Sequence, residues 1–201
     1  MKATDYLKAQ HREVEQLFSR IEQADGTKKQ KLFEELAANL VGHDAIEREI
    51  FYPACEDQMG INDVMGEALV EHGLVEFSLL RADENIGSEY FDYFITVLKE
   101  NVQHHVKEEE EQLLPRIMEA LEADALETLG AKMEARFNKL RASDWRATLV
   151  ENVREVMTGA LKTGSENVEE IEAQRASAKP KAPSRATAKP RSKSSSHRAH
   201  R

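Results

Sequence analysis

The sequence has little of what several protein classes require. A single cysteine, Cys55, among 201 residues excludes an intramolecular disulfide and a thiolate-rich metal site. No run of about 18 apolar residues is present, so we expect no membrane-spanning helix. The first residues, MKATDYLKAQH, lack the apolar centre of a signal peptide. From these absences we expect a soluble, cytoplasmic protein in a reducing compartment.

The alternating apolar pattern that predicts β-strands is almost absent as well. Apolar residues instead recur at helical spacing in four segments, at about residues 4–22, 27–52, 63–85 and 88–114. Short connections between amphipathic helices favour antiparallel neighbours, so we expect an all-α protein with an antiparallel, up-down-up-down four-helix bundle. Pro53 and Pro115 are expected to stop or kink the second and fourth helices.

Additional C-terminal helices are predicted after the bundle. Residues 116–141 carry an apolar rhythm suited to covering one end of the bundle. Residues 144–172 carry a weaker rhythm, interrupted at Thr163-Gly164-Ser165, which is typical of a peripheral helix in one or two pieces. We therefore divide the chain into a bundle with its trailing helix (1–141), a helical extension (142–174) and a tail (175–201).

Acidic residues are missing from the tail, which holds nine of the chain's 28 Lys and Arg side chains. The rest of the chain sets 19 basic residues against 37 acidic ones, so the net charge of -9 combines an acidic body with a basic tail. The Ala, Lys, Pro and Ser composition of residues 175–201 cannot bury enough apolar area to offset ordering entropy, so we expect disorder. Such a tail can contact nucleic acid non-specifically, fold back on its acidic body, or stay solvated.

A repeated motif is the most informative feature. Residues 43–53 read HDAIEREIFYP and residues 105–115 read HVKEEEEQLLP, so both copies follow His-x3-Glu-x5-Pro. One helical turn separates the histidine from the glutamate in each copy, which places both side chains on one face. A lone histidine, His11 or His72, precedes each copy by 32 or 33 residues. The chain therefore reads as a duplicated pair of helices.

The repeat directs six metal-binding side chains inward: His11, His43, Glu47, His72, His105 and Glu109. Buried carboxylates need a positive partner, and a pair of divalent ions supplies it. Mixed nitrogen and oxygen ligation favours iron or manganese over a closed, tetrahedral zinc site. Open positions on such a metal suit the binding or activation of O2, NO or peroxide. A metal-free bundle with hydrogen-bonded core histidines is the alternative.

On these residues the chain resembles the hemerythrin-like HHE cation-binding family. The resemblance covers about residues 4–141 and includes HREVE at His11, HDAIEREIFYP, EHGLVE at His72 and HVKEEEEQLLP. It implies a four-helix bundle around two iron ions bridged by an oxo or hydroxo group, with manganese or a mixed pair as the alternative. It also implies that the six residues named above are the metal ligands.

Two residues depart from the family's pattern, and a third offers a second choice of ligand. Oxygen-carrying members have a second histidine one turn after the third-helix ligand, where this chain has Glu76, and Glu15 is in the matching place on the first helix. Each is either an added ligand or an acceptor that orients an imidazole N–H. His104 competes with His105 for the fourth-helix position, although the repeat favours His105. The substitution at Glu76 weakens the case for reversible O2 carriage.

Three functions are compatible with these residues. We favour a non-haem di-iron protein that binds or senses O2, NO or related oxidants. The alternatives are an enzyme that removes peroxide or NO, or donates iron to damaged clusters, and a nucleic-acid-associated protein acting through residues 175–201. The sequence fixes no oligomeric state. Its four tyrosines, Tyr6, Tyr52, Tyr90 and Tyr93, are interpreted as packing residues.

Overall fold

The computed structural model describes residues 1–60 and 63–158. Across these residues the secondary structure is helical and no strand is present, which confirms the all-α prediction. The elements in chain order are α1 (Ala3–Glu22), α2 (Gly26–Ile46), η1 (Glu47–Phe51), α3 (Tyr52–Met59), α4 (Asp63–Glu84), α5 (Phe91–Glu108), η2 (Glu109–Leu113), α6 (Leu114–Ala120), α7 (Ala123–Arg141) and α8 (Trp145–Thr158). The tail at 175–201 and the predicted interruption at 163–165 lie outside the described residues.

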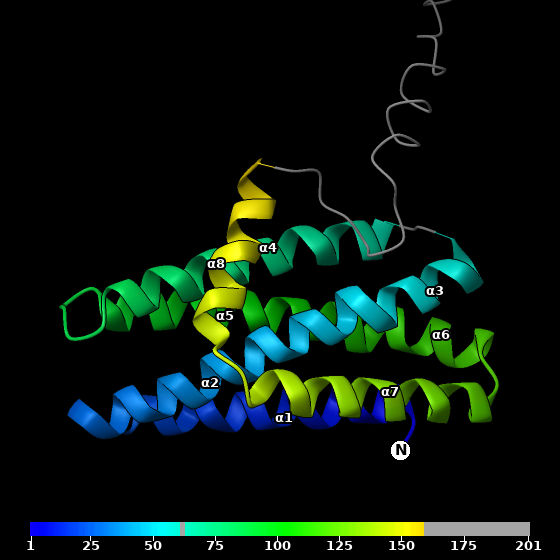
Figure 1. The fold of residues 1–201 in the computed structure, drawn as a ribbon, viewed down its shortest axis with the longest axis horizontal. Helices are drawn as coiled ribbons and strands as arrows, with labels where there is room; N and C mark the ends of the chain where they lie inside the picture. The colour runs from blue at the N-terminus through cyan, green and yellow to red at the C-terminus, as the bar shows by residue number, and fades with distance from the viewer. Residues whose placement is uncertain (61–62, 159–201) are drawn as a thin grey trace, which may run out of the picture. The chain divides into compact units, whose positions relative to one another are not determined.

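The bundle consists of two helical hairpins, α1 with α2 and α4 with α5 (Figure 1). Residues 23–25 and 85–90 connect the helices within each hairpin, and such short connections make the paired helices antiparallel. No described helix is long and apolar enough to cross a membrane.

Two apolar clusters fill the bundle, with a polar layer between them. Along α1, Leu7 belongs to one cluster and Val14 to the other, and His11 lies between them. The same order holds along α4, and the order is reversed along α2 and along α5 with η2, so each of these helices also carries its histidine between residues of the two clusters. The apolar periodicity of each helix therefore aligns four histidines at one level of the bundle.

The helices do not stop at Pro53 and Pro115, which corrects the prediction of helix stops. Each proline lies in the first turn of a continuing helix, α3 or α6, directly after a π-helical turn, η1 or η2. In the first copy the N–H of Tyr52 donates to the carbonyl of Glu47, five residues back, and the second copy makes the equivalent bond. A π turn widens the helix before the proline ring, so the clash that ends a regular α-helix is relieved.

The remaining helices cover the sides of the bundle. α7 lies along α1 and α2 (Figure 1) rather than across one end, which corrects the position expected for residues 116–141. Gly130 permits this contact, because a Cβ there would lie 2.3 Å from the carbonyl oxygen of Met1. α8 packs against α4 and α2, and its first turns are anchored by the buried side chains of Trp145 and Leu149.

Candidate metal centre

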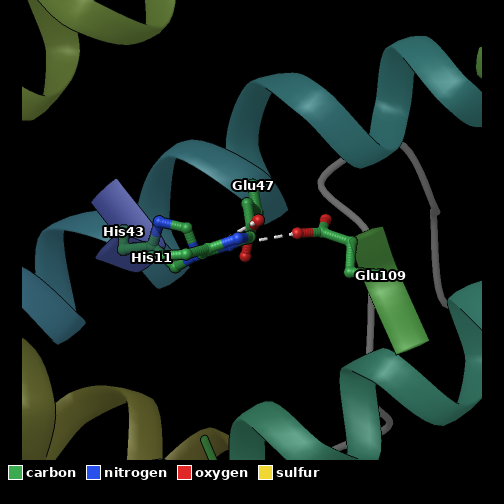
Figure 2. A group of neighbouring side chains, drawn as sticks. All are labelled: His11, His43, Glu47 and Glu109. Carbon is green, nitrogen blue, oxygen red and sulfur yellow. Dashed lines mark hydrogen bonds and ion pairs between the residues drawn. The ribbon is translucent and has the colours of Figure 1, made fainter. Parts of the chain in front are cut away.

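The structure brings the six predicted ligands into one buried layer. Their donor atoms form two groups, each within 4.8 Å: His11, His43, Glu47 and Glu109, and Glu47, His72 and His105. Figure 2 shows the first group, in which side chains from four different elements point toward one another. None of the six is more than 7% exposed. The charges in this layer are therefore almost fully removed from water.

Glu47 lies between two pairs of imidazoles. Its Oε1 is 3.3 Å from Nε2 of His43, and its Oε2 is 3.1 Å from Nε2 of His72. Within each pair the Nε2 atoms face each other, at 3.3 Å for His11 with His43 and at 3.1 Å for His72 with His105. The Glu47 carboxylate thus faces both imidazole pairs, with Oε1 toward His43 and Oε2 toward His72.

In each of the four layer histidines, the other ring nitrogen has an oxygen acceptor. The Nδ1 contacts are Glu110 at 2.8 Å for His11, Gln10 at 2.9 Å for His43, Asp44 at 2.5 Å for His72 and Glu71 at 3.0 Å for His105. Each acceptor is the immediate sequence neighbour of a predicted ligand on another helix, a signal that the sequence analysis missed. Oxygen acceptors place the proton on Nδ1, so the Nε2 lone pairs converge inside the layer.

Three carboxylate oxygens of the layer have no hydrogen-bond partner among the described residues, namely Oε1 of Glu47 and both oxygens of Glu109. Burying carboxylates without donors costs several kcal/mol. A cation between them would be bound by the nitrogen lone pairs and would neutralise the unpartnered carboxylate oxygens. The donor set therefore fits a pair of divalent metal ions.

The electrostatics of the layer point the same way. Burial alone would lower the pKa of His11, but the carboxylate of Glu109, whose Oε2 lies 3.3 Å from Nε2 of His11, outweighs it and raises this pKa to about 9. Burial alone would raise the pKa of Glu47, but the neighbouring His43 and His72 hold it well below its usual range. Both shifts have one cause, because the buried oxygens require positive charge among the nitrogens.

Comparison with known proteins agrees with the predicted family. The family model described as the hemerythrin HHE cation binding domain matches residues 2–117, more than half of the chain. The chain belongs to this hemerythrin HHE family. The crystal structure of an HHE cation-binding domain-containing protein from Mycobacterium kansasii is similar, with a TM-score of 0.65 and 28% sequence identity, over 76% of this chain and 99% of that one. No curated protein sequence matches significantly.

Within this HHE domain, the hydroxyl of Tyr52 contacts the buried layer. The sequence had led us to interpret Tyr52 as a packing residue, without this contact. Its side chain is fully buried, and its Oη lies 3.1 Å from Nε2 of His72 and 3.4 Å from Oε2 of Glu47. Burial and then the charge of Glu47 raise the pKa of Tyr52 well above its usual value, so the phenol keeps its proton. A residue five positions after Glu47 faces away on an α-helix but returns to the same side across a π turn.

The two departures from the family pattern, Glu15 and Glu76, and the alternative ligand His104 lie outside both donor groups. Glu15 is exposed. Glu76 is only 2% exposed, and burial followed by the charge of Asp44 raises its pKa to about 8. The side chain of His104 is 64% exposed and contacts Glu71, at 3.2 Å. The structure therefore turns His105, rather than His104, toward the layer.

Proposed function

We propose that this chain binds two iron ions in the buried layer and that it binds or senses O2, NO or a related oxidant there. One ion would be held by the first group and the other by the second, with Glu47 shared: His11, His43, Glu47 and Glu109, then Glu47, His72 and His105. The observation that carries the proposal is the position of Glu47, whose two oxygens face different imidazole pairs at 3.3 and 3.1 Å.

The donor set supports iron. Imidazole nitrogens and carboxylate oxygens without thiolate suit a redox-active first-row metal. Bound in this layer, a pair of such ions would supply Lewis acidity and electrons to a small molecule. The second group offers three protein donors and the first offers four. A metal at the His72 and His105 position would therefore have more coordination sites free for a small ligand.

A small cavity next to the layer supports a small ligand. Its volume is about 30 Å³, and the four imidazoles form part of its wall. The rest of the wall is mainly aliphatic, from Val14, Leu40, Val41, Val75, Leu79, Val102 and Val106. Since a single water needs about 10–15 Å³ by the same measure, the space suits a molecule of two heavy atoms. Apolar walls favour O2 or NO over an organic substrate.

The protein's own side chains fix the orientation of the imidazole rings and keep one proton on the phenol of Tyr52. The Nδ1–H bonds to Asp44 and Glu71 fix the ring orientations of His72 and His105. The raised pKa of Tyr52 keeps a proton on its Oη, beside Nε2 of His72. A ligand atom beside Nε2 of His72 would meet this hydrogen-bond donor, which belongs to the apolar cluster of Leu7 and not to the wall of the small cavity.

Iron stoichiometry and ligand response test the proposal. The chain loaded with ferrous iron under nitrogen is expected to hold two ions and to change its visible absorption on addition of O2 or NO. Glu49→Gln is the matched control, because Glu49 lies two residues from Glu47 but pairs with Arg136 at the surface. A chain that binds no iron, or whose iron responds to neither O2, NO nor peroxide, would contradict the proposal.

Removal of peroxide is the second candidate function, and the buried phenol of Tyr52 favours it. A proton held 3.1 Å from Nε2 of His72 is suited to donation toward a peroxide oxygen. Iron-dependent loss of hydrogen peroxide that slows in Tyr52→Phe at unchanged iron content would support catalysis. Unchanged peroxide in the presence of the iron-loaded chain would leave binding or sensing as the function.

Nucleic-acid contact through residues 175–201 stays a prediction from composition. Deleting these residues is expected to abolish retention on DNA-cellulose at low salt, because the phosphate contacts of Lys and Arg are salt-dependent. Retention that survives the deletion would exclude the tail as the contact.

A further inference from the structure

α8 lies beyond residue 117, where the family match ends, yet one of its side chains reaches the surroundings of the metal centre. The side-chain amide of Asn152 donates to Oε1 of Glu76 at 2.5 Å and lies 3.4 Å from Oδ2 of Asp44. Oδ1 of Asp44 in turn accepts the Nδ1–H of His72 at 2.5 Å. Asn152 therefore links α8 to two acidic side chains beside the centre.

The packing of α8 fixes the position of this amide. Arg146 makes a two-pronged contact with Asp83, with Nε to Oδ2 at 3.0 Å and Nη2 to Oδ1 at 2.9 Å. Further along, α8 passes close to Gly73, where a Cβ would lie 2.8 Å from Cγ1 of Val156. A glycine next to His72 thus lets α8 approach α4 closely, and Asn152 lies between these two contacts.

Glu76 needs the donor that Asn152 supplies. The side chain is 2% exposed, and its Oε2 has no hydrogen-bond partner among the described residues. The nearest cation is Arg48, with 3.6 Å between Nη1 and Oε2 of Glu76 and 3.8 Å between Nε and Oδ2 of Asp44. One guanidinium is thus shared between two buried carboxylates. An amide NH2 has two hydrogens and can serve both carboxylates at once.

Without Asn152, Glu76 has an alternative partner. It lies one helical turn after His72, so the two side chains share a face of α4. Glu76 also lines the same small cavity as His72 and His105. Turned toward the centre, a carboxylate at this place would be an added donor for the second group. In the structure it instead accepts from Asn152 and belongs to neither donor group.

We propose that Asn152 is a positioning residue that retains Glu76 on α8 and so keeps one coordination position at the His72 and His105 metal open for a small ligand. The inference rests on the proposed function, since it requires metal in the layer. It assigns to α8, outside the family match, control over whether the centre accepts an external ligand.

Cobalt(II) and azide test this inference without any activity measurement. Cobalt(II) is a useful probe because its visible absorption depends on the number and type of its ligands. The full chain loaded with cobalt(II) is expected to bind azide at the open position. In Asn152→Leu, which keeps the side-chain size and removes the donors, Glu76 competes for that position. If Glu76 holds it nine-tenths of the time, azide affinity falls about tenfold.

A double variant identifies Glu76 as the competitor. Asn152→Leu combined with Glu76→Ala is expected to restore azide affinity to within about threefold of the original, because no carboxylate is left to compete. Arg154→Leu, on the exposed side of α8 where Arg154 pairs with Glu151, is the matched control and should bind azide normally. Circular dichroism and thermal melting establish that each variant is folded.

Each outcome separates the inference from the proposed function. If the unaltered chain binds neither iron nor cobalt(II), the proposed function fails and the inference fails with it. If it binds cobalt(II) and azide leaves the absorption unchanged, or if Asn152→Leu binds azide as the unaltered chain does, the metal proposal stands and the role of Asn152 is refuted. A loss in Asn152→Leu that Glu76→Ala does not restore also refutes it, because the loss then has another cause.

Discussion

The two copies of the repeated motif share their backbone and differ in what their glutamates reach. Glu47 and Glu109 each begin a π-helical turn that leads into a proline. Glu47 belongs to both donor groups, whereas Glu109 belongs to the first group alone. Five residues later the first copy has Tyr52 against the layer, and the second copy has the apolar Leu114. The two copies therefore share a backbone, while the donor groups around them differ in size and in their neighbouring side chains.

This inequality has a chemical consequence. The first group has four donors and the second has three, with a phenol and the Glu76 carboxylate nearby. A position enclosed by protein donors stabilises its metal, and a position with fewer donors leaves room for an external ligand. Under the proposed function, the first position would hold its metal and the second would bind the external ligand. The substitutions below test that assignment, starting from the largest expected effect.

Glu47→Ala should affect both positions, since the shared carboxylate serves both imidazole pairs. We expect iron content to fall from two ions per chain to nearly none. Metal at a hundredfold excess over its Kd stabilises the fold by about 2.7 kcal/mol, so the melting temperature in iron should fall by about 5–10 °C. Iron analysis and thermal melting measure the two effects. Two ions retained in the variant would remove Glu47 from the centre.

Truncating one donor of each group should separate the two positions. His105→Ala leaves the second group with two donors, and we expect one ion to be lost. Glu109→Ala leaves the first group with three donors, as many as the second group has, so that ion should stay but bind on the order of tenfold more weakly. Metal titration followed by absorption distinguishes the two. Equal losses in both variants would mean that the positions are equivalent.

Neutralising the acceptors behind the rings should give smaller, position-specific effects. Glu71→Gln removes the charge that accepts from Nδ1 of His105, and Glu110→Gln does the same for His11. Each is expected to weaken its own ion by about tenfold and leave the other unchanged, because such acceptors orient the ring and raise its basicity. Competition with a chelator of known affinity measures the change. If Glu71→Gln weakened the ion at His11 instead, or Glu110→Gln the ion at His105, the pairing of acceptors with rings would be contradicted.

The helices and the six donors could be predicted because both follow from periodicity along one chain. A spacing of four residues on an α-helix places His43 and Glu47 on one face, and the repeat makes the same statement twice. Which glutamate is shared could not be predicted in this way. The two copies have identical spacing, and the difference between Glu47 and Glu109 arises from how four helices meet.

The missed residues have similar causes. Tyr52 was missed because a helical wheel assumes 3.6 residues per turn and the π turn before Pro53 breaks that register. Gln10 and Asp44 orient rings on neighbouring helices, so no spacing within one helix reveals them. Asn152 comes from a helix with weak periodicity beyond the repeat, and only the docking of α8 brings it to Glu76.

Tyr52→Phe should give the first copy an apolar side chain at this position, as Leu114 is in the second copy, without removing a metal ligand. We expect two ions to remain, because no group member is lost. The hydrogen-bonding partner of Glu47 and His72 disappears, at a cost of about 1 kcal/mol in the free energy of unfolding. The absorption of the iron at the His72 position should shift while the other stays unchanged. Urea unfolding and the absorption spectrum measure these effects, and loss of an ion would instead make Tyr52 a ligand.

His104→Ala should have the smallest effect and sharpens the choice between adjacent histidines. Its side chain is 64% exposed and reaches the centre only through Glu71, which contacts His104 with Oε1 at 3.2 Å and His105 with Oε2 at 3.0 Å. We expect two ions to remain and the free energy of unfolding to change by less than about 0.5 kcal/mol, as for other surface substitutions. The second ion should bind within about threefold of its original affinity, because Glu71 still accepts from His105. Loss of an ion in His104→Ala, with His105→Ala retaining both, would reverse the assignment of the fourth-helix donor.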